Sequence, residues 1–411
     1  MSTDRMLTGR REFVRRAAWV GAGAMAVGAL PRLSLATPNA AGQATTQRLA
    51  LVVLRGGMDG LGAAPAVGDP DFAAARGPLA QLQEAALPLE GPFALHPALK
   101  QLHALYGQGE LAVIHATGLP YKERSHFDAQ QVLESGGTQP YQLSTGWLAR
   151  ALQVQGQRGM AISTAVPLVL RGNDEIDTWA PSALPEPSPD LVARLQRLYA
   201  GDPALAQALA RARGLRQDPQ MPVGMDMAAM QGGARNAAVA LTRKAGEFLA
   251  RPGGPQVAVI EMNGWDTHAN QAAPNGALAN NLRTLDAALA ALRETMKGDG
   301  STQDWWARTV VLVVTEFGRE VAVNGTLGTD HGSGGVAFAL GGAVAGGRVL
   351  ADWPGLSRAD RFEGRDLRIT TDLRAVFKGV LHDHLKISQT VLSRDVFPGS
   401  TDLRSVSLLR G

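Results

Sequence analysis

The sequence predicts an α/β protein with a doubly wound, mostly parallel sheet and a helical insertion. Short apolar runs, typical of buried strands, alternate with longer segments of helical periodicity. Several of these runs are continuously apolar, as in strands that are buried on both faces of a parallel sheet. This order of elements favours one sheet with helices on both faces.

Six strands and seven helices are predicted from these patterns. The strands are expected at residues 48–54, 111–116, 161–170, 257–262, 309–315 and 336–340. The helices are expected at residues 96–106, 127–134, 191–199, 204–215, 234–250, 277–297 and 372–384. Four prolines between residues 181 and 189, with few strand signals nearby, place the helical insertion at about 175–235. A single domain is therefore expected at 48–400, followed by a C-terminal tail at 401–411.

The first 36 residues are typical of a twin-arginine signal peptide. Arg10 and Arg11 are followed by one spacer and Phe13, and then by a weakly apolar stretch at 17–30. The small residues of 34–36 suit cleavage by a signal peptidase. The alternative is an anchor helix that stays in place. We expect the twin-arginine export machinery as a partner, residues 37–47 as a linker, and a periplasmic or secreted mature protein.

The composition excludes several classes of function. Without residues 1–36 the chain keeps 34 basic and 35 acidic side chains, so nothing indicates binding to nucleic acid or to an anionic membrane surface. There is no cysteine, so neither a disulfide nor a lipid anchor on cysteine can form. No stretch of the mature chain approaches 18 apolar residues, and we expect no transmembrane span. Nothing indicates a nucleotide cofactor.

Methionines cluster in the predicted insertion, at Met221, Met225, Met227 and Met230. Thioether groups bind copper in some exported proteins. Clustered methionines more often form a flexible packing surface, and we expect that role here.

Polar side chains occur where the predicted strands end. They are Asp59 after strand 48–54, Ser125 in the loop after 111–116, Asp266 and His268 after 257–262, Glu316 after 309–315, and Asp330 and His331 before 336–340. Because sites in open parallel sheets form beyond the carboxyl ends of the strands, we expect these side chains to share one cleft.

Carboxylates and imidazoles together suit Zn or Mn, whereas carboxylates alone would suit Mg or Ca. Two metals about 4 Å apart could clamp an anionic ester oxygen and activate a bound hydroxyl. Ser125, at the start of a helix, is the candidate nucleophile, and Arg124 or Arg55 would stabilise the developing charge.

Each residue also has a purely structural interpretation. An aspartate after a glycine turn, such as Asp59, is commonly a turn residue, and Ser125 could be only a helix cap. Asp266 and His268 could hydrogen-bond within their own loop. His331 is the strongest functional candidate, because the glycines around Asp330 and His331 leave little side-chain bulk that needs packing.

At these positions the sequence resembles the domain of unknown function 1501 family. The resemblance rests on Arg55-Gly56-Gly57-Met58-Asp59-Gly60, Arg124-Ser125-His126-Phe127-Asp128, Trp265-Asp266-Thr267-His268, Glu316-Phe317-Gly318-Arg319, Asp330-His331-Gly332, the stretch 341–348 and Asp352-Trp353-Pro354-Gly355-Leu356. It implies an exported protein with the doubly wound fold of the alkaline phosphatase and sulfatase superfamily. It also implies a one- or two-metal site and a Ser, Thr or modified Cys nucleophile.

The resemblance assigns roles to individual residues. Asp59 matches the first metal aspartate of the superfamily, and Ser125 lies about where the nucleophile is expected. Asp266 and His268 match the next ligand pair, with a shorter spacing than usual. Either Glu316 or Asp330 matches the late acidic ligand, and His331 the last histidine. No residue has the setting needed for formylglycine, which argues against a sulfatase of the usual type.

Two hypotheses follow from the sequence. The first is a metal-dependent hydrolase of phosphate or sulfate esters, in which Ser125 attacks and Asp59, Asp266, His268, Glu316, Asp330 and His331 supply metal ligands. The second is a non-catalytic exported protein on the same scaffold, which binds a partner or a surface polymer.

Overall fold

The computed structural model describes residues 46–81, 85–181, 187–217, 233–272, 275–298 and 303–410. The predicted signal peptide, nearly all of the linker and the methionine cluster lie outside these residues. None of the helices in the described part of the chain is long and apolar enough to cross a membrane.

One sheet of nine strands organises the described residues. In spatial order its strands are β10 (Arg348–Leu350), β4 (Leu111–Gly118), β9 (Gly335–Leu340), β8 (Thr309–Thr315), β1 (Arg48–Leu54), β7 (Val257–Met262), β5 (Gly159–Ala161) and β6 (Ile176–Thr178), and β11 (Thr371–Asp372) pairs with the end of β4. All pairings are parallel except those of β9, which runs antiparallel to both β4 and β8. The predicted mostly parallel sheet is confirmed.

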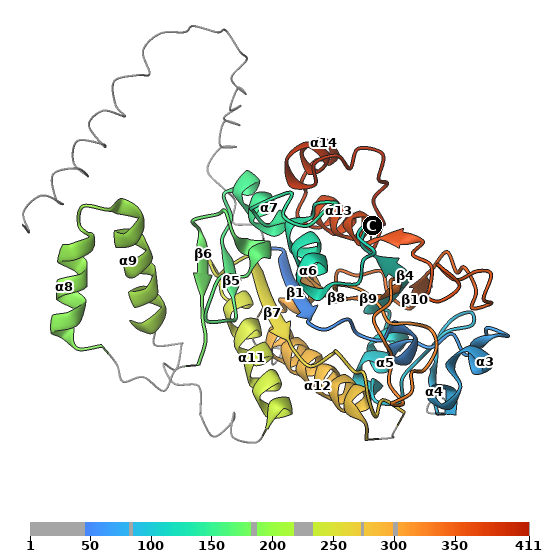
Figure 1. Cartoon of the computed structure of the whole chain (residues 1–411). Helices are drawn as coiled ribbons and strands as arrows, with labels where there is room; N and C mark the ends of the chain where they lie inside the picture. The colour runs from blue at the N-terminus through green and yellow to red at the C-terminus, as the bar shows by residue number, and fades with distance from the viewer. Residues whose placement is uncertain are drawn as a thin grey trace, which may run out of the picture. The chain divides into compact units, whose positions relative to one another are not determined.

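Both faces of the sheet are buried. Along β1, Leu49, Leu51 and Val53 belong to one apolar core and the alternate residues belong to the other, as the two-residue period of a strand requires. The first core includes α6 (His126–Ser135), α7 (Trp147–Gln155) and α13 (Leu373–Asp383), and the second includes α5 (Lys100–Gly107), α11 (Ala234–Leu249) and α12 (Ala277–Lys297). Figure 1 shows these two sets of helices on opposite sides of the strands. The predicted doubly wound α/β fold is confirmed.

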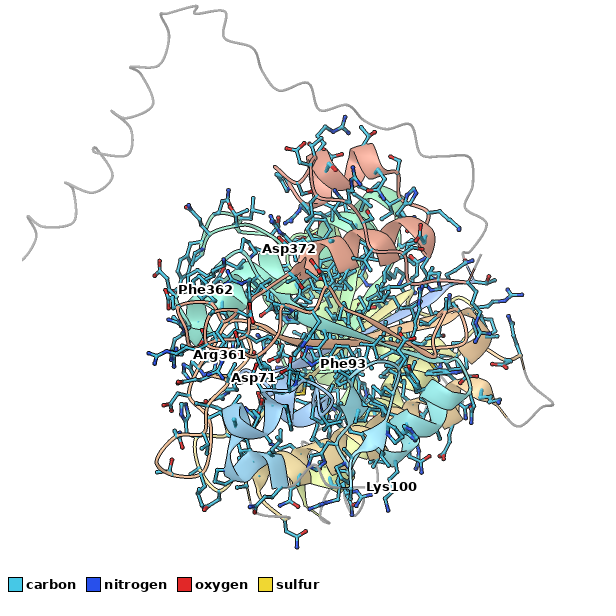
Figure 2. The ribbon with its side chains drawn as sticks, turned by 90° about the vertical axis from the view of Figure 1, so that its right-hand side faces the viewer. Asp71, Phe93, Lys100, Arg361, Phe362 and Asp372 are labelled. Carbon is cyan, nitrogen blue, oxygen red and sulfur yellow. The ribbon has the colours of Figure 1, made fainter. Side chains whose placement is uncertain are left out.

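Shorter elements complete the domain. They are α2 (Gly60–Ala63), α3 (Phe72–Arg76), α4 (Pro78–Gln81), the β2–β3 hairpin (Leu87–Pro88 and Ala94–Leu95), α14 (Gln389–Val391), and the single turns η1 (Leu168–Leu170), η2 (Trp306–Arg308) and η3 (Leu392–Val396). Asp372, visible in Figure 2, accepts a hydrogen bond from the backbone N–H of Arg374 and so caps α13.

Two boundaries differ from the sequence prediction. The prediction of a strand at 161–170 is wrong, because β5 ends at Ala161 and the chain then bends before η1. Pro167 has no N–H to give to a strand neighbour, and the Ser163 hydroxyl donates to the carbonyl of Ala165 instead. Helix α5 begins at Lys100 rather than at residue 96, because the His96 ring accepts the backbone N–H of Ala98 in a local turn.

The predicted insertion contains helices α8 (Pro189–Tyr199) and α9 (Pro203–Gln217), but it opens with a strand. Its first residues form β6, which extends the main sheet beyond β5. The C-terminal segment is also part of the domain: Leu408 is fully buried, and Leu409 forms a bridge with Val344.

The direction of β9 decides where the site lies. Leu54 of β1 is level with Thr315 of β8 and Met262 of β7, so the three strands end at one edge. Because β9 runs the opposite way, it begins at that same edge with Gly335. The loops after residues 54, 262 and 315 and the segment before residue 335 therefore meet.

Candidate metal centre

Three imidazoles and one carboxylate converge at this edge. The Nε2 atom of His331 lies 3.1 Å from Nε2 of His126, 3.0 Å from Nε2 of His268 and 3.2 Å from Oδ1 of Asp266. Asp266 Oδ1 is 2.9 Å from Nε2 of His268 and 3.6 Å from Nε2 of His126. His126, Asp266 and His331 thus each offer a ligand atom within 4.8 Å of the others, and His268 borders this group through its contacts with His331 and Asp266.

These four side chains come from three different parts of the chain. His126 is the first residue of α6, directly after the N-cap residue Ser125. Asp266 and His268 lie in the loop after β7, and His331 lies in the glycine-rich segment before β9, where it forms an antiparallel bridge with Arg319. The strand topology therefore brings together residues that are 205 positions apart.

Glycines near His331 allow backbone segments to approach closely. A Cβ on Gly328 would lie 2.2 Å from the backbone of His268, and a Cβ on Gly332 would lie 2.3 Å from that of Arg319. Neither glycine has a positive φ. Their role is close contact rather than the conformational freedom that the sequence suggested.

The other ring nitrogen of each histidine has an oxygen partner. The Nδ1 of His126 lies 2.8 Å from Oε1 of Glu316, and that of His268 lies 3.0 Å from Oδ1 of Asp330. The Nδ1 of His331 lies 3.0 Å from the carbonyl oxygen of Arg124, whose φ is 60°. Because carboxylates and carbonyls only accept, Nδ1 carries the proton in all three rings. In the neutral rings the Nε2 lone pairs then face the shared volume.

The carboxylates of the site are held in the ionised form. Partial burial works against ionisation of Asp266, but the hydrogen bond and charge of Arg319 outweigh it and lower the pKa. Burial likewise opposes ionisation of Glu316, and hydrogen bonds that include those from His126 and Gln130 lower its pKa. Hydrogen bonds from Asn324 and His268 lower the pKa of Asp330.

The histidines differ from one another. The hydrogen bond to Glu316 raises the pKa of His126, whereas burial and the neighbouring charges of His126 and Arg319 lower the pKa of His331. Without a metal, the cluster therefore favours a proton on His126 and a neutral His331. That proton and the guanidinium of Arg319 offset part of the repulsion between the converging lone pairs, and a bound divalent cation would offset the rest.

The donor set fits a divalent metal. Ligands of a tetrahedral zinc ion, each about 2.0–2.1 Å from the metal, lie about 3.3 Å from one another. Five of the six donor pairs are separated by 2.9–3.6 Å, which brackets that value, whereas His126 and His268 do not contact one another. Three nitrogens and one oxygen match zinc better than magnesium or calcium, which prefer oxygen ligands. One side of the centre is accessible, since the side chains of Asp266 and His268 are 45% and 42% exposed.

The buried side chain of Arg319 holds Asp266 in place. Its guanidinium is buried and donates to Asp266 Oδ1, while Nε donates to the carbonyl of Gly57 at 2.6 Å and Nη1 to that of Thr329 at 2.9 Å. These bonds tie the ends of three loops to one rigid side chain. Phe317, also buried, packs against the rings of His126 and His331, with ring centroids 4.7 and 5.1 Å apart, respectively.

Asp59 lies apart from the cluster. It is buried, and its carboxylate accepts from the guanidinium of Arg76, from the side-chain amide of Gln271 and from the backbone N–H of Gly62 at the start of α2. Both of its oxygens are occupied by donors of the protein. This placement matches the turn and cap interpretation rather than that of a metal ligand.

Glu316 and Asp330 lie one hydrogen bond away from the converging atoms. Each contacts the Nδ1 of a histidine, so they orient rings rather than point at the shared volume. The sequence resemblance allowed either of these two residues to be the late acidic metal ligand.

Of the three predicted catalytic residues, Arg124 and Ser125 directly precede His126 in the sequence, whereas Arg55 follows β1. Ser125 directly precedes His126, and its hydroxyl does not cap α6. Arg55 forms ion pairs with Glu134 and Glu261. The Arg124 side chain pairs with Asp366 and Glu363, and only its carbonyl reaches the site. Both guanidiniums are therefore neutralised by carboxylates.

His126 was missed as a ligand by the sequence reasoning. It lies in the segment that was singled out for Ser125, and it is a histidine at the expected edge of the sheet. The same criterion that selected His268 and His331 would have found it. Ser125 was taken as the functional residue of this segment because of its hydroxyl, and the neighbouring His126 was given no role.

The chain belongs to the family described as "Protein of unknown function (DUF1501)", which matches residues 104–396. The predicted family is thus confirmed. No match was found among curated proteins.

Several solved structures are similar to the fold at low sequence identity. A 2-O GAG sulfatase is 11% identical, with a TM-score of 0.42 over 88% of this chain and 73% of its own. The phosphonate monoester hydrolase of Agrobacterium radiobacter is 12% identical, with a TM-score of 0.34 over 74% and 70%. The lipoteichoic acid synthase LtaP from Listeria monocytogenes is 10% identical, with a TM-score of 0.34 over 76% and 68%.

Proposed function

We propose that this protein is an exported, zinc-dependent hydrolase of phosphate or sulfate esters with a single metal ion. The observation that carries the proposal is the contact of His331 Nε2 with three further donor atoms, His126 Nε2 at 3.1 Å, His268 Nε2 at 3.0 Å and Asp266 Oδ1 at 3.2 Å. His126, Asp266 and His331 form the core of this group, with ligand atoms that all lie within 4.8 Å of one another. Each ring is held by an oxygen at Nδ1, which is the usual arrangement around a metal-bound histidine.

One ion is expected rather than two. The carboxylates that could bind a second metal are engaged elsewhere, Asp59 by Arg76, Glu316 by His126 and Asp330 by His268. Arg319 already supplies a fixed positive charge beside Asp266. The proposed site thus combines two positive charges: an exchangeable zinc ion and the permanently bound guanidinium of Arg319.

A zinc ion bound here would polarise an ester oxygen and lower the pKa of a hydroxyl beside it. Ser125 is the residue that we expect to supply that hydroxyl, because it directly precedes the ligand His126 in the chain and does not cap α6. The exposed side of the centre, formed by Asp266 and His268, would admit the ester.

The decisive experiment measures metal and activity on the same samples. The full chain, matured through its own export route, is expected to contain one zinc per chain by elemental analysis and to hydrolyse p-nitrophenyl phosphate or p-nitrophenyl sulfate. Ser125→Ala is expected to keep the zinc and lose at least about a hundredfold in kcat. Ser163→Ala, on an exposed loop, is the matched control. A chain without zinc would refute the metal centre.

One observation favours a second function, metal binding without catalysis. Arg55 and Arg124, which were expected to stabilise the developing charge, are both paired with carboxylates. The same experiment separates the two functions. Stoichiometric zinc without hydrolysis of either ester would support the non-catalytic protein that binds a partner or a surface polymer.

Export is tested at the signal peptide. Replacing Arg10 and Arg11 by lysine should leave the precursor in the cytoplasm, because the twin-arginine route depends on that pair. The matched control replaces Arg15 and Arg16 by lysine, which makes the same chemical change five residues later. Periplasmic accumulation of the first variant would refute the route.

A further inference from the structure

A cavity of about 700 Å³ lies outside the metal centre, lined by residues of α5, α11 and α12 and by the segment before α5. Its wall includes His96, Lys100, Arg235, Arg283 and Asp286. Lys100, the first residue of α5, is labelled in Figure 2. None of these residues belongs to the metal centre.

His96 carries a hydrogen-bond donor that the protein does not use. The residue is only 6% exposed, and its Nδ1 accepts the backbone N–H of Ala98 at 3.0 Å. Burial and the positive charge of Arg283 lower the pKa of His96 to about 4, so the ring is neutral near pH 7. Its single proton therefore sits on Nε2. No residue in the described part of the chain accepts a hydrogen bond from this N–H, although His96 lines the cavity.

This donor faces the cavity and is not enclosed by protein atoms. Water or a bound molecule in the cavity can therefore accept its hydrogen bond. A bound acceptor would receive a bond whose direction the buried ring fixes.

The charges around His96 indicate the nature of that acceptor. Within the described residues, Lys100 and Arg235 form no ion pair, and Arg283 donates only to the neutral amide oxygens of Asn275 and Asn280. Asp286 is the acidic residue of the wall, and its two oxygens already accept the backbone N–H groups of residues 101 and 102. Among the described residues, the wall thus presents three cations against one carboxylate that is already engaged.

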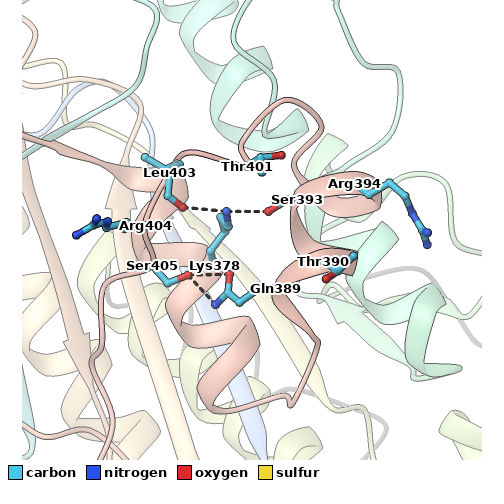
Figure 3. A pocket seen from close by; sticks show the side chains of 9 residues that line it. All are labelled: Lys378, Gln389, Thr390, Ser393, Arg394, Thr401, Leu403, Arg404 and Ser405. Atoms are coloured by element: carbon cyan, nitrogen blue, oxygen red, sulfur yellow. Dashed lines mark hydrogen bonds between the residues drawn. The ribbon is translucent and has the colours of Figure 1, made fainter.

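In a second cavity, the buried cation already has protein acceptors for all of its N–H groups. This cavity lies beside Lys378 and is drawn in Figure 3. The Lys378 ammonium is buried, but it donates to Ser393 Oγ at 3.0 Å, to the Ser400 carbonyl at 2.7 Å and to the Leu403 carbonyl at 2.9 Å. All three of its N–H groups are used, so this lysine needs nothing from the cavity. The contrast singles out the cavity at His96.

We propose that the cavity at His96 binds a dianionic oxyanion of the phosphate or sulfate type. The His96 Nε2–H donates one directional hydrogen bond, and Arg235, Arg283 and Lys100 supply the positive charge. An anion with several oxygens can accept from all of them, and its two charges match the excess of two cations over carboxylates among the described residues of the wall. This site is independent of the proposed hydrolase activity.

The test uses inorganic phosphate and, separately, sulfate as probes of the full chain. The protein is first treated with a chelator so that the metal centre cannot bind the anion, and ionic strength is held constant with sodium chloride. Calorimetric titration is expected to show one saturable site for at least one of the two anions. Binding of neither anion would overturn the proposal.

Variants locate the site. The double variant Arg235→Ala/Arg283→Ala should weaken binding about tenfold or more, whereas Arg308→Ala/Arg358→Ala, which removes two exposed arginines elsewhere, should not. His96→Phe keeps a ring but removes the donor, and it is also expected to bind about tenfold more weakly. Should that variant fail to fold, the arginine pair decides the question. Unchanged affinity in the arginine double variant would overturn the proposal.

Discussion

The metal centre and the Asp59–Arg76 pair both follow strands that end at the same edge of the sheet, yet their carboxylates have opposite surroundings. Asp59 and Arg76 are each 1% exposed and neutralise one another inside the protein. At the centre, Arg319 compensates Asp266 and its Nη1 lies 3.4 Å from His268 Nε2, while the Nε2 atoms of His126 and His331 lie against one another on a partly exposed surface. The comparison shows that a polar residue at a strand end binds an external cation only where the fold has not already provided one.

The largest effect is expected from breaking the internal pair. Arg76→Met leaves the Asp59 carboxylate buried without its cation, which should lower the free energy of unfolding by about 3–5 kcal/mol. Urea denaturation measures this loss. Zinc content should stay at one per chain.

A double variant sharpens the result. Asp59→Asn/Arg76→Met removes both charges and should recover part of the lost stability, because no unpaired charge remains. Should Asp59→Asn alone lose zinc, Asp59 would be a ligand after all and the contrast between the two regions would fail.

The next effect is expected at the centre itself. His331→Ala removes the ring whose Nε2 is closest to all the other donors, and zinc affinity should fall by more than about a hundredfold. Competition with a chromophoric chelator measures the affinity. His103→Ala, at an exposed histidine of α5, is the control. A variant that melts a few degrees lower but keeps its zinc would show that His331 only holds the loop together.

Smaller losses are expected from the residues that orient the rings. Glu316→Gln should weaken zinc binding by about 10- to 100-fold, because a buried carboxylate no longer fixes the proton on Nδ1 of His126. Asp330 is about half exposed, so Asp330→Asn should cost less than Glu316→Gln under the same chelator competition. Equal losses of zinc affinity in the two variants would show that the burial of the carboxylate does not determine how much it contributes to zinc binding.

The smallest effect concerns the pH dependence of the metal-free protein. The raised pKa of His126 means that its protonated form contributes stability below the ordinary histidine value of about 6.5, and that this contribution is lost as pH rises through the raised pKa. His331 has a lowered pKa, so its contribution is present above about 6.5 and is lost as pH falls through that lowered pKa.

NMR titration of the ring protons in chelator-treated protein measures both values. Glu316→Gln should lower the pKa of His126, because the hydrogen bond to Glu316 is the main cause of the shift. Identical titration of His126 and His331 would contradict the asymmetry of the cluster.

Much of this arrangement could be read from the sequence, because apolar runs and strand ends are local signals. They located the sheet, the helices on both faces and the edge at which Asp266, His268 and His331 meet. What the local pattern does not contain is the identity of distant partners. Nothing near Asp59 shows that Arg76 will reach back to it, and nothing near Arg124 shows that Asp366 will neutralise its side chain.

The glycines illustrate the same limit. Their number around His331 indicated that the segment was unusual, but the reason lies in other loops. Gly328 and Gly332 are needed because the backbones of His268 and Arg319 pass within reach of any side chain there. Close contacts between segments more than 10 residues apart become visible only once the sheet order is known.

The position of β9 also sets the order in which the molecule can be assembled. This strand is inserted between β4 and β8, so the middle of the sheet stays open until residues 335–340 have left the ribosome. The donors at 126, 266 and 268 precede it in the chain, and His331 arrives only with it. Such late, long-range closure is slow compared with the formation of local helices. A tightly held ion would therefore mark molecules that have finished folding, and unfinished chains would be left without one.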